Sequence, residues 1–423
     1  MIKRILERAK TIFKLTIKLV AVLLVVTVLY SFNLFMMKPF SIDHYLGKEL
    51  ILDLIESPEE LTYVGILDKF DWITNHNSKL SIPQDDDIEN DIKQIEKVIK
   101  TLYKYDDSKL SDIQKSTKKI AIFDYENQLK ELKDFPYLDY PLNQIGGIHL
   151  NTIEFMNSVH PIRSDSEAIA FIKRTDSIMD VYQGVLNHLK KQADNGIYPP
   201  EFVYDHVINQ LNEFINVANT EHPLYKQFML KIVELELSND QVDYLEKEIT
   251  RSINESVTPG FKLLRNFMAN TKKNANSNHG IWSQPGGDEY YKLKIRTFTT
   301  TDYSPEEIHQ MGLNEVKRIS SRMREILTSL GYAESKSVGE LMNELNENPD
   351  FLYADTSDRK EIVVNDYTDM VNEAIRVMTD YFHTMPKSEV IVKAVPEYSE
   401  QNAAGGYYQS PALDGSRPGV FYA

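Results

Sequence analysis

An uncharged, apolar run near the N-terminus constrains this chain more than any other feature. Residues 19–37, which begin with Leu19 and end with Met37, contain no Asp, Glu, Lys or Arg. At a rise of ~1.5 Å per residue, about 20 apolar residues cross the ~30 Å hydrocarbon core of a bilayer. A soluble core helix needs one apolar face, not an apolar surface on every side. The run therefore predicts a transmembrane helix, and the membrane is the first expected partner.

The charges on either side of the run predict its orientation. Residues 1–18 contain six Lys and Arg residues and one acid, whereas Lys38 is the only base between the run and Lys48. Basic flanks stay in the cytoplasm. We therefore expect a single-pass membrane protein with a cytoplasmic basic tail (1–18), an anchor (19–37) and a main domain that is periplasmic or extracellular.

A cleaved signal peptide, which would give a soluble secreted form, is the alternative to an anchor. The apolar region of a signal peptide is usually ~7–15 residues long and precedes a small-x-small cleavage site. Here the run is longer, and the sequence MMKPF at 36–40 is a poor cleavage site. The chain has no cysteine, which excludes a lipid attached to cysteine and any disulfide. Independence of redox state permits a periplasmic or extracellular location.

The charge of the main domain argues against nucleic acid as a partner. Six of the 47 bases and one of the 63 acids lie in residues 1–37, so residues 38–423 carry 41 bases, 62 acids and a net charge of −21. Nucleic-acid phosphates require a basic face. The same acidity argues against a main domain that lies broadly on anionic lipid, and it favours solubility.

Helical periodicity dominates residues 38–385. Apolar residues recur at spacings of three and four, and caps, prolines and glycines mark the ends. We expect one mainly α-helical domain with helices at 42–56, 60–74, 88–102, 113–132, 164–195, 223–237, 240–254, 259–272, 288–298, 305–330 and 355–382, and with a further helix that begins at 199–200.

The character of the chain changes after Pro386. Residues 389–395 (EVIVKAV) are rich in β-branched side chains and predict a strand, and Tyr407-Tyr408 and residues 420–422 (VFY) are two further strand candidates. We expect residues 386–423 to form a small sheet that begins a catalytic subdomain. Because a domain rarely ends inside a strand with an unpaired edge, we also expect an incomplete fold that is truncated at Ala423.

The usual catalytic motifs are missing from the sequence. None of the ten histidines has another four residues away, there is no cysteine nucleophile, and the Gly-Gly pairs lack phosphate-loop spacing. Two carboxylate/His pairs at i, i+3, Glu306/His309 and Asp380/His383, are interpreted as helix-end charges rather than metal ligands. Trp282 and Tyr290-Tyr291 could line a cleft, although aromatic residues more often pack between helices.

Several segments resemble the DUF885 family, a bacterial group related to helical zinc metallopeptidases. The most specific is TTTDYSPEEIHQMG at 299–312. The others are residues 147–149, 195–200, 280–282, 287–291, 395–397, 406–408 and 414–422 (DGSRPGVFY). The match covers most of the chain after the anchor.

The resemblance implies a helical fold with a small sheet beside a cleft. In the family, the strand after Arg-Pro-Gly leads to a His-Glu-x-x-x-Gly-His-His motif that holds zinc and the catalytic Glu. This chain ends before that motif, so we expect no catalytic residue, no metal ligand and no cofactor in these residues, with zinc expected in full-length relatives.

What remains by resemblance is part of a peptide-binding surface. An edge strand in related peptidases pairs with the peptide backbone, and Gly406, Tyr407 and Tyr408 are the candidates for it. Arg417 could pair with a substrate carboxylate or form an internal ion pair. Tyr422 completes the candidate set.

Two functions stay open from the sequence. The first is the N-terminal part of a membrane-anchored zinc peptidase-like protein, inactive in this chain, whose relatives hydrolyse peptides. The second is a non-catalytic binding or scaffold protein of the cell envelope. The sequence predicts neither the substrate nor the oligomeric state.

Overall fold

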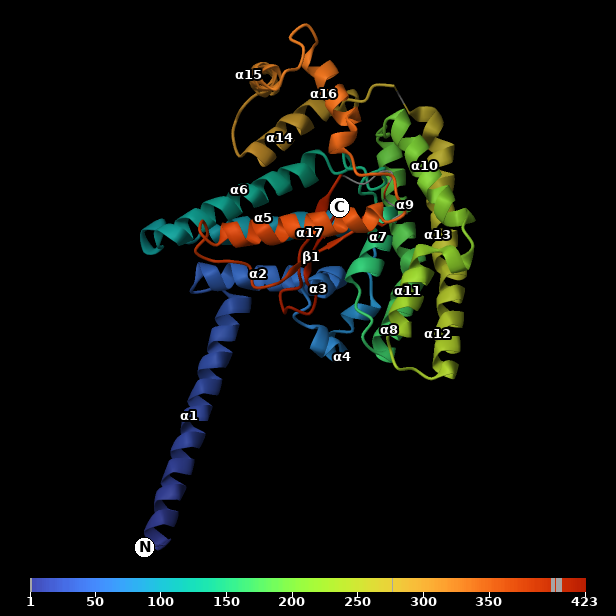
Figure 1. Cartoon of the computed structure of the whole chain (residues 1–423). Coiled ribbons are helices and arrows are strands. Elements are labelled where there is room, and N and C mark those ends of the chain that lie inside the picture. The colour runs from blue at the N-terminus through green and yellow to red at the C-terminus, as the bar shows by residue number, and fades with distance from the viewer. Residues whose placement is uncertain (1, 276, 397–399, 401–404) are drawn as a thin grey trace. The chain divides into compact units, whose positions relative to one another are not determined.

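The computed structural model describes residues 2–275, 277–396, 400 and 405–423, with side chains from residue 12 onward. The expected fold class, mainly α with a small C-terminal sheet, is confirmed (Figure 1). Glu397, in one segment of the family resemblance, lies outside this part of the chain. The packing divides the chain into two compact units, Met1–Ser57 with Asp86–Asp134 and Pro58–Asp85 with Phe135–Ala423. The boundaries expected at residues 38 and 386 stay predictions.

The first unit contains the N-terminal apolar helix and three further helices: α1 (Ile2–Met36), α2 (Ile42–Glu56), α5 (Asp87–Leu102) and α6 (Asp112–Asp134). Residues Ile12–Met36 of α1 are long and apolar enough to cross a membrane, and the most apolar 18-residue stretch among them has no buried residue. The core of the unit is small and consists of Ile42, Tyr45, Val98, Leu102 and Tyr105.

The turn between α1 and α2 is held by side-chain hydrogen bonds. Asn33 Nδ2 donates to Lys38 O (2.9 Å), and Asn33 Oδ1 accepts from Phe40 N (2.9 Å). Tyr105 donates from its hydroxyl to Pro39 O (2.8 Å), and Lys38 Nζ lies 4.6 Å from the centroid of the Tyr105 ring. Within this unit, the apolar helix is therefore fixed to the residues that follow it.

The second unit is built on a helical bundle, in which α9 and α10 pack against α13 and α8 packs against α12. Figure 1 shows these helices in green to yellow. Its core of 28 buried apolar residues includes Phe171, Tyr182, Phe228 and Phe261, all fully buried. The bundle and its neighbours comprise α3 (Pro58–Val64), α4 (Asp71–Thr74), α7 (Ile148–Glu154), α8 (Asp165–Asp176), α9 (Ile178–Asp194), α10 (Glu201–Asn216), α11 (Pro223–Val233), α12 (Asn239–Ser252) and α13 (Thr258–Thr271).

Four more helices and three strands complete the second unit. The helices are α14 (Gly287–Thr299), α15 (Pro305–Ser329), α16 (Val338–Glu347) and α17 (Arg359–Met378). Ser304 and Glu307 form the reciprocal capping box that the sequence predicts for α15, and Gly331 follows it with φ 89°. The α16 helix was not expected from the sequence.

The helix expected at 60–74 is wrong as a single element. It ends at Val64, because Gly65 adopts φ 74°, and two short turns and α4 follow. A Cβ at Gly65 would lie 2.9 Å from Asp414 Oδ1, so glycine also permits close packing there. The helix expected at 164–195 is likewise divided at Ser177, which lies between α8 and α9.

The sheet consists of β1 (Val390–Lys393), β2 (Tyr407–Gln409) and β3 (Gly419–Tyr422) in the order β1-β3-β2. Strand β3 pairs parallel with β1 and antiparallel with β2. The expectation that the last strand has an unpaired edge is therefore wrong. Ala423 extends the β1 pairing, because its N–H donates to Lys393 O (2.9 Å) and its carbonyl accepts from Val395 N (3.1 Å).

Candidate functional site

The central strand β3 brings the predicted site residues Tyr407, Tyr408 and Tyr422 together. Tyr407 lies opposite Tyr422, and Tyr408 lies opposite Phe421. Since successive side chains point to opposite faces, Tyr407 and Tyr422 share one face of the sheet and Tyr408 the other. The Phe421 ring stacks on Tyr367 of α17 at 5.8 Å, so α17 covers part of that second face.

Tyr407 and Tyr422 form the inner part of the candidate site. Their rings stack at 4.7 Å, and Tyr422 is only 4% exposed. The Tyr422 hydroxyl lies 3.4 Å from Ser158 Oγ and 3.3 Å from Gln409 Oε1. Burial raises the pKa of both tyrosines, and the Glu154 carboxylate raises it further. Both phenols therefore stay protonated at neutral pH.

Ser158 belongs to a π-helical turn, Phe155–Val159, that follows α7. Such turns are rare and occur often at functional sites. Here Ser158 donates to Glu154 Oε1 (2.7 Å) and meets Tyr422, so the wider helical turn supports the inner face of the sheet. No sequence signal predicted this turn.

The outer edge of β2 presents backbone polar groups. Gly419 N donates to Glu389 O, and Ala423 N donates to Lys393 O. Every second residue of β3 therefore directs its backbone N–H and C=O toward β1. The intervening Val420 and Tyr422 therefore bond Gln409 and Tyr407 of β2. It follows that the N–H and C=O of Tyr408 point away from β3. The Tyr408 side chain is 51% exposed, and Gly406 is also exposed.

The glycine of the Arg-Pro-Gly segment makes room for Tyr408. A Cβ at Gly419 would lie 2.3 Å from the Tyr408 hydroxyl oxygen. The phenol thus crosses over the start of β3, where only a glycine leaves space. This contact fixes the ring of Tyr408 beside the exposed edge.

Within the described part of the chain, Arg417 does not form the internal ion pair that was one of the two expectations for it. Its Nη2 donates to Tyr63 O (2.8 Å) and its Nη1 to Ser410 O (3.2 Å), and the guanidinium lies 4.8 Å from the centroid of the Tyr63 ring. These contacts are to carbonyl oxygens and an aromatic ring, not to carboxylates. Leu413 N also donates to Val64 O (2.9 Å). Arg417 therefore holds the loop before β3 against α3.

Arg174 is a second arginine with a positioning role, and the sequence did not single it out. Its side chain is fully buried and donates to His76 O (2.9 Å), Thr62 Oγ1 (2.8 Å) and Lys79 O (2.6 Å). Another donor lies 2.8 Å from His160 Nδ1. Burial lowers the pKa of Arg174 to about 10, so it stays charged at neutral pH.

Among the residues with described side chains, no group of three or more His, Cys, Asp or Glu could hold a metal ion. The zinc that the family resemblance implies therefore has no fitting ligand set here. Glu306, His309, Asp380 and His383 are all exposed on the surface of the second unit. No chemical step through a metal can be assigned to these residues.

The aromatic residues proposed to line a cleft are divided between two environments. Trp282 is 61% and Tyr291 47% exposed. Tyr290 instead packs edge-on against Phe135, with ring centroids 5.6 Å apart. They do not form one aromatic surface of the kind that a cleft requires.

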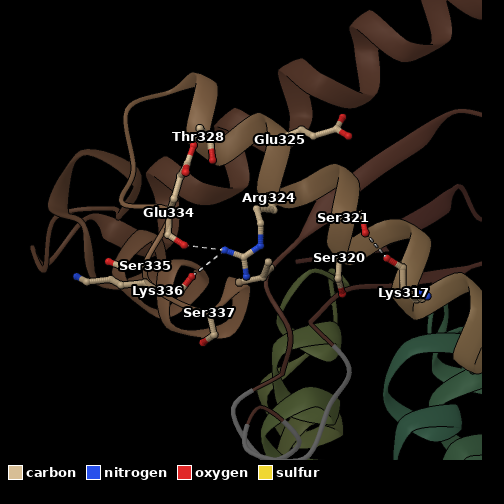
Figure 2. A pocket seen from close by; sticks show the side chains of 11 residues that line it. Lys317, Ser320, Ser321, Arg324, Glu325, Thr328, Glu334, Ser335, Lys336 and Ser337 are labelled. Carbon is tan, nitrogen blue, oxygen red and sulfur yellow. Dashed lines mark hydrogen bonds between the residues drawn. The ribbon is translucent and has the colours of Figure 1, made fainter.

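An open groove of roughly 1210 Å³ runs between α15 and the segment that leads into α16. Figure 2 shows Arg324 at its centre, where Nη1 donates to Glu334 O (3.2 Å) and Lys336 O (2.9 Å). Two of its serines serve the backbone, since Ser321 donates to Lys317 O and Ser337 caps α16. Its lining contains serines, lysines, Arg324 and two glutamates, but no histidine or cysteine.

Comparisons with known proteins agree with this architecture. A family model described as a bacterial protein of unknown function (DUF885) matches residues 58–423. The crystal structure of a candidate lipoprotein from Colwellia psychrerythraea has a TM-score of 0.78 at 25% identity, covering 89% of this chain and 67% of that one. A candidate lipoprotein of unknown function from Shewanella oneidensis has a TM-score of 0.57 at 12% identity, covering 90% and 64%. The second likeness shows the fold alone.

The chain thus spans about two thirds of the length of these two structures. A comparison with curated protein sequences finds no match.

Proposed function

The chain belongs to the DUF885 family, and we propose that it is a membrane-tethered protein that binds extended polypeptide along the β2 edge. The observation that carries the proposal is the outward-facing N–H and C=O of Tyr408. A peptide that adds to this edge would satisfy both groups as an additional strand. Peptide binding is common to both functions that the sequence leaves open.

The surroundings of the edge support an extended ligand. Tyr408 is half exposed beside it and offers an apolar ring with a polar tip, which suits peptide side chains. Tyr407, stacked on buried Tyr422, fixes the strand from the inner face. Arg417 acts through the loop it holds, and we assign it a positioning role rather than contact with a substrate carboxylate.

Hydrolysis of the bound peptide is the finer proposal, and it concerns longer relatives. The resemblance implies zinc chemistry in them, whereas the residues of this chain provide a surface that would present an extended chain. The non-catalytic alternative, an envelope scaffold, uses the same edge without cleavage. The edge can therefore be tested without deciding between the two.

Removal of a single N–H tests peptide binding. Tyr408→Pro deletes the outward donor and leaves the β3 ladder intact, since proline is tolerated on an edge strand. Tyr408→Thr keeps the donor and removes the ring. Anisotropy of short fluorescein-labelled unstructured peptides measures binding, with a proline-only peptide as the control that cannot donate a backbone N–H.

We expect Tyr408→Pro to weaken binding about fivefold, because one hydrogen bond contributes ~1 kcal/mol. Tyr408→Thr should weaken it less, and the proline-only peptide should not bind. Equal affinity of the wild-type and Tyr408→Pro proteins would contradict strand addition. Failure of every labelled peptide to bind the wild-type chain would contradict the proposal as a whole.

The tether is the second part of the proposal. The apolar helix supports membrane association, and we propose that its basic end is cytoplasmic and the second unit lies across the membrane. The two structural neighbours are described as candidate lipoproteins, but this chain has no cysteine to carry a lipid. An apolar helix would thus replace a lipid as the anchor.

The absence of cysteine gives a clean test of this topology. Thr11→Cys places one thiol in the basic tail, and Ser329→Cys places one at the end of α15. A membrane-impermeant maleimide, applied to cells with an opened outer envelope, should label Ser329→Cys alone. Both should react after detergent is added. Labelling of Thr11→Cys in sealed cells would reverse the orientation.

A further inference from the structure

A short segment of the second unit exposes a group of large apolar side chains. Ile66 is 52%, Phe70 51%, Trp72 81% and Ile73 63% exposed. They lie on two consecutive turns between Gly65 and Asn75, residues that both have positive φ. We call this segment, residues 66–73, the apolar turn. A tryptophan exposed to this degree beside three other apolar side chains marks an interaction site.

Buried polar contacts make the apolar turn rigid. The His76 ring, only 2% exposed, lies with Nε2 3.3 Å from Asp68 Oδ1 and Nδ1 3.0 Å from Asp71 Oδ1. Asp71 also accepts from Asn77 N (2.9 Å), and Asp68 Oδ2 accepts from Arg163 Nη2 (2.9 Å). These contacts hold the carboxylates toward the protein, so the apolar side chains on the same turns are directed into solvent.

The charge of the apolar turn differs from that of the chain as a whole. The chain carries a net charge of −16. In this segment, however, both acids have internal basic or amide partners, while Lys69 and the nearby Lys79 are exposed. The side chains that the segment itself exposes are thus apolar or basic. Aromatic and aliphatic side chains flanked by lysines suit the boundary between lipid headgroups and acyl chains.

We propose that the apolar turn inserts into the surface of the same bilayer that α1 anchors, as a second membrane contact. The short connection argues for the bilayer as the occupant. Ile66 follows the end of α1 by only thirty residues, of which the 15 of α2 extend ~22 Å as a helix. A segment tethered so closely meets lipid at a high local concentration. The inference depends on the tether in the proposed function, and not on peptide binding.

The two tryptophans of the chain, Trp72 and Trp282, provide a matched pair of probes. The full-length Trp282→Phe protein reports on the apolar turn alone. The full-length Trp72→Phe protein reports on a tryptophan that is 61% exposed outside the turn. Each is reconstituted in phosphatidylcholine vesicles and quenched with nitroxide lipids, labelled at the headgroup or along the acyl chain, and with aqueous iodide.

We expect Trp72 to emit at shorter wavelength than Trp282 and to lose most of its emission to headgroup and shallow acyl nitroxides. Iodide should quench Trp282 more strongly than Trp72. In the Trp282→Phe protein, whose one tryptophan is Trp72, the double substitution Phe70→Glu and Ile73→Glu should restore quenching of Trp72 by iodide. Val233→Glu, at an apolar residue of α11 that is 75% exposed, should not.

Three outcomes would overturn the inference. Equal iodide quenching of both tryptophans would leave the turn in water. Protection from iodide without nitroxide quenching, rising with the protein-to-lipid ratio, would mean that a second copy of the chain covers it. Nitroxide quenching of both tryptophans to the same extent would indicate unspecific adsorption. If α1 does not anchor the protein, the protein will not float with the vesicles. If α1 anchors it but the apolar turn does not insert, the protein will float and Trp72 will remain open to iodide.

Discussion

Arg174 shows how one charge can order a segment without a carboxylate partner. Its donors reach carbonyl oxygens of His76 and Lys79 and the hydroxyl of Thr62, which precede it by about a hundred residues in the chain. Phe155 covers the guanidinium at 4.9 Å. The arginine fork satisfies several buried acceptors at once, so segment 58–85 is fixed to α8 by one side chain.

We predict that Arg174→Met destabilises the chain by about 3 kcal/mol or more. Each buried acceptor left without a donor costs ~1–3 kcal/mol, and methionine supplies none. Urea unfolding of the detergent-solubilised protein measures the loss. Arg318→Met is the control, because Arg318 pairs with Glu315 at an exposed site of α15, where an ion pair contributes little to stability. Equal stability of the two variants would refute the role given to Arg174.

His149 predicts a dependence of stability on pH. Its ring is fully buried, Nε2 lies 2.9 Å from Gln210 Oε1, and burial lowers its pKa to about 4 from the ordinary 6.5. Above pH 6.5 the ring is neutral in both states. Between pH 6.5 and 4 the unfolded chain binds the proton first, so the free energy of unfolding falls as the pH falls, by roughly 3 kcal/mol in all.

The variant His149→Gln removes this titration and keeps an amide donor for Gln210. We expect the loss of stability between pH 7 and 5 to be about 2 kcal/mol smaller in the variant than in the wild type. The comparison within each protein cancels any constant cost of the substitution. An unchanged pH dependence would mean that the buried imidazole is not the group responsible.

Single residues also show what sequence alone could not provide. The Arg-Pro-Gly segment was recognisable, but one partner of Arg417, the Tyr63 carbonyl, lies in α3, 354 residues earlier. Arg174 has no local motif at all. Every residue has a backbone carbonyl, whatever its type, so a sequence pattern cannot indicate which carbonyls an arginine will contact.

At the scale of elements, local signals predicted most helices and strands. Ile42–Glu56 was predicted to the residue, because Ser41 caps its start and apolar periodicity ends with it. The breaks at Gly65 and Ser177 were missed, since the periodicity continues across them. The π-helical turn Ile253–Val257 was missed for the opposite reason: the sequence predicts a break between helices at 240–254 and 259–272, whereas α12, this turn and α13 form one continuous path. Tertiary contacts, not local propensity, decide such positions.

Strand order is the element-level property that the sequence left undetermined. Three short apolar segments predict three strands, but not which strand is central. The structure places β3 between the other two, so the stability of the whole sheet depends on it. Tyr422 is the side chain that attaches β3 to the rest of the unit, through Tyr407 and the π-helical turn.

We therefore predict that Tyr422→Ala opens the sheet locally and costs about 3–5 kcal/mol, as for other buried aromatic residues. Tyr422→Phe should cost ~1 kcal/mol or less, because its hydroxyl contacts are 3.3–3.4 Å long. Tyr408→Ala removes a half-exposed ring and should therefore cost less stability than Tyr422→Ala. Amide exchange across β1, β2 and β3 measures the opening. Protection in Tyr422→Ala equal to that of the wild type would contradict the central role of β3.

At the scale of the whole molecule, two units are interleaved along the chain. Segment 58–85 leaves the first unit and belongs to the second, and residues 86–134 return to the first. Domain boundaries predicted as consecutive residue ranges cannot describe two units that alternate along the chain. The periodic pattern of α5 and α6 predicts two helices but not which apolar core they join.

The unequal cores of the two units predict unequal stability. The first unit buries five apolar residues as a cluster and the second buries 28. Since apolar burial is the main favourable term, α5 and α6 should open at lower free energy than α9 and α13. Hydrogen exchange of the full chain in lipid nanodiscs should show faster exchange across Asp87–Leu102 and Asp112–Asp134 than across Ile178–Asp194 and Thr258–Thr271. A single opening free energy shared by all four helices would show instead that the two units unfold as one.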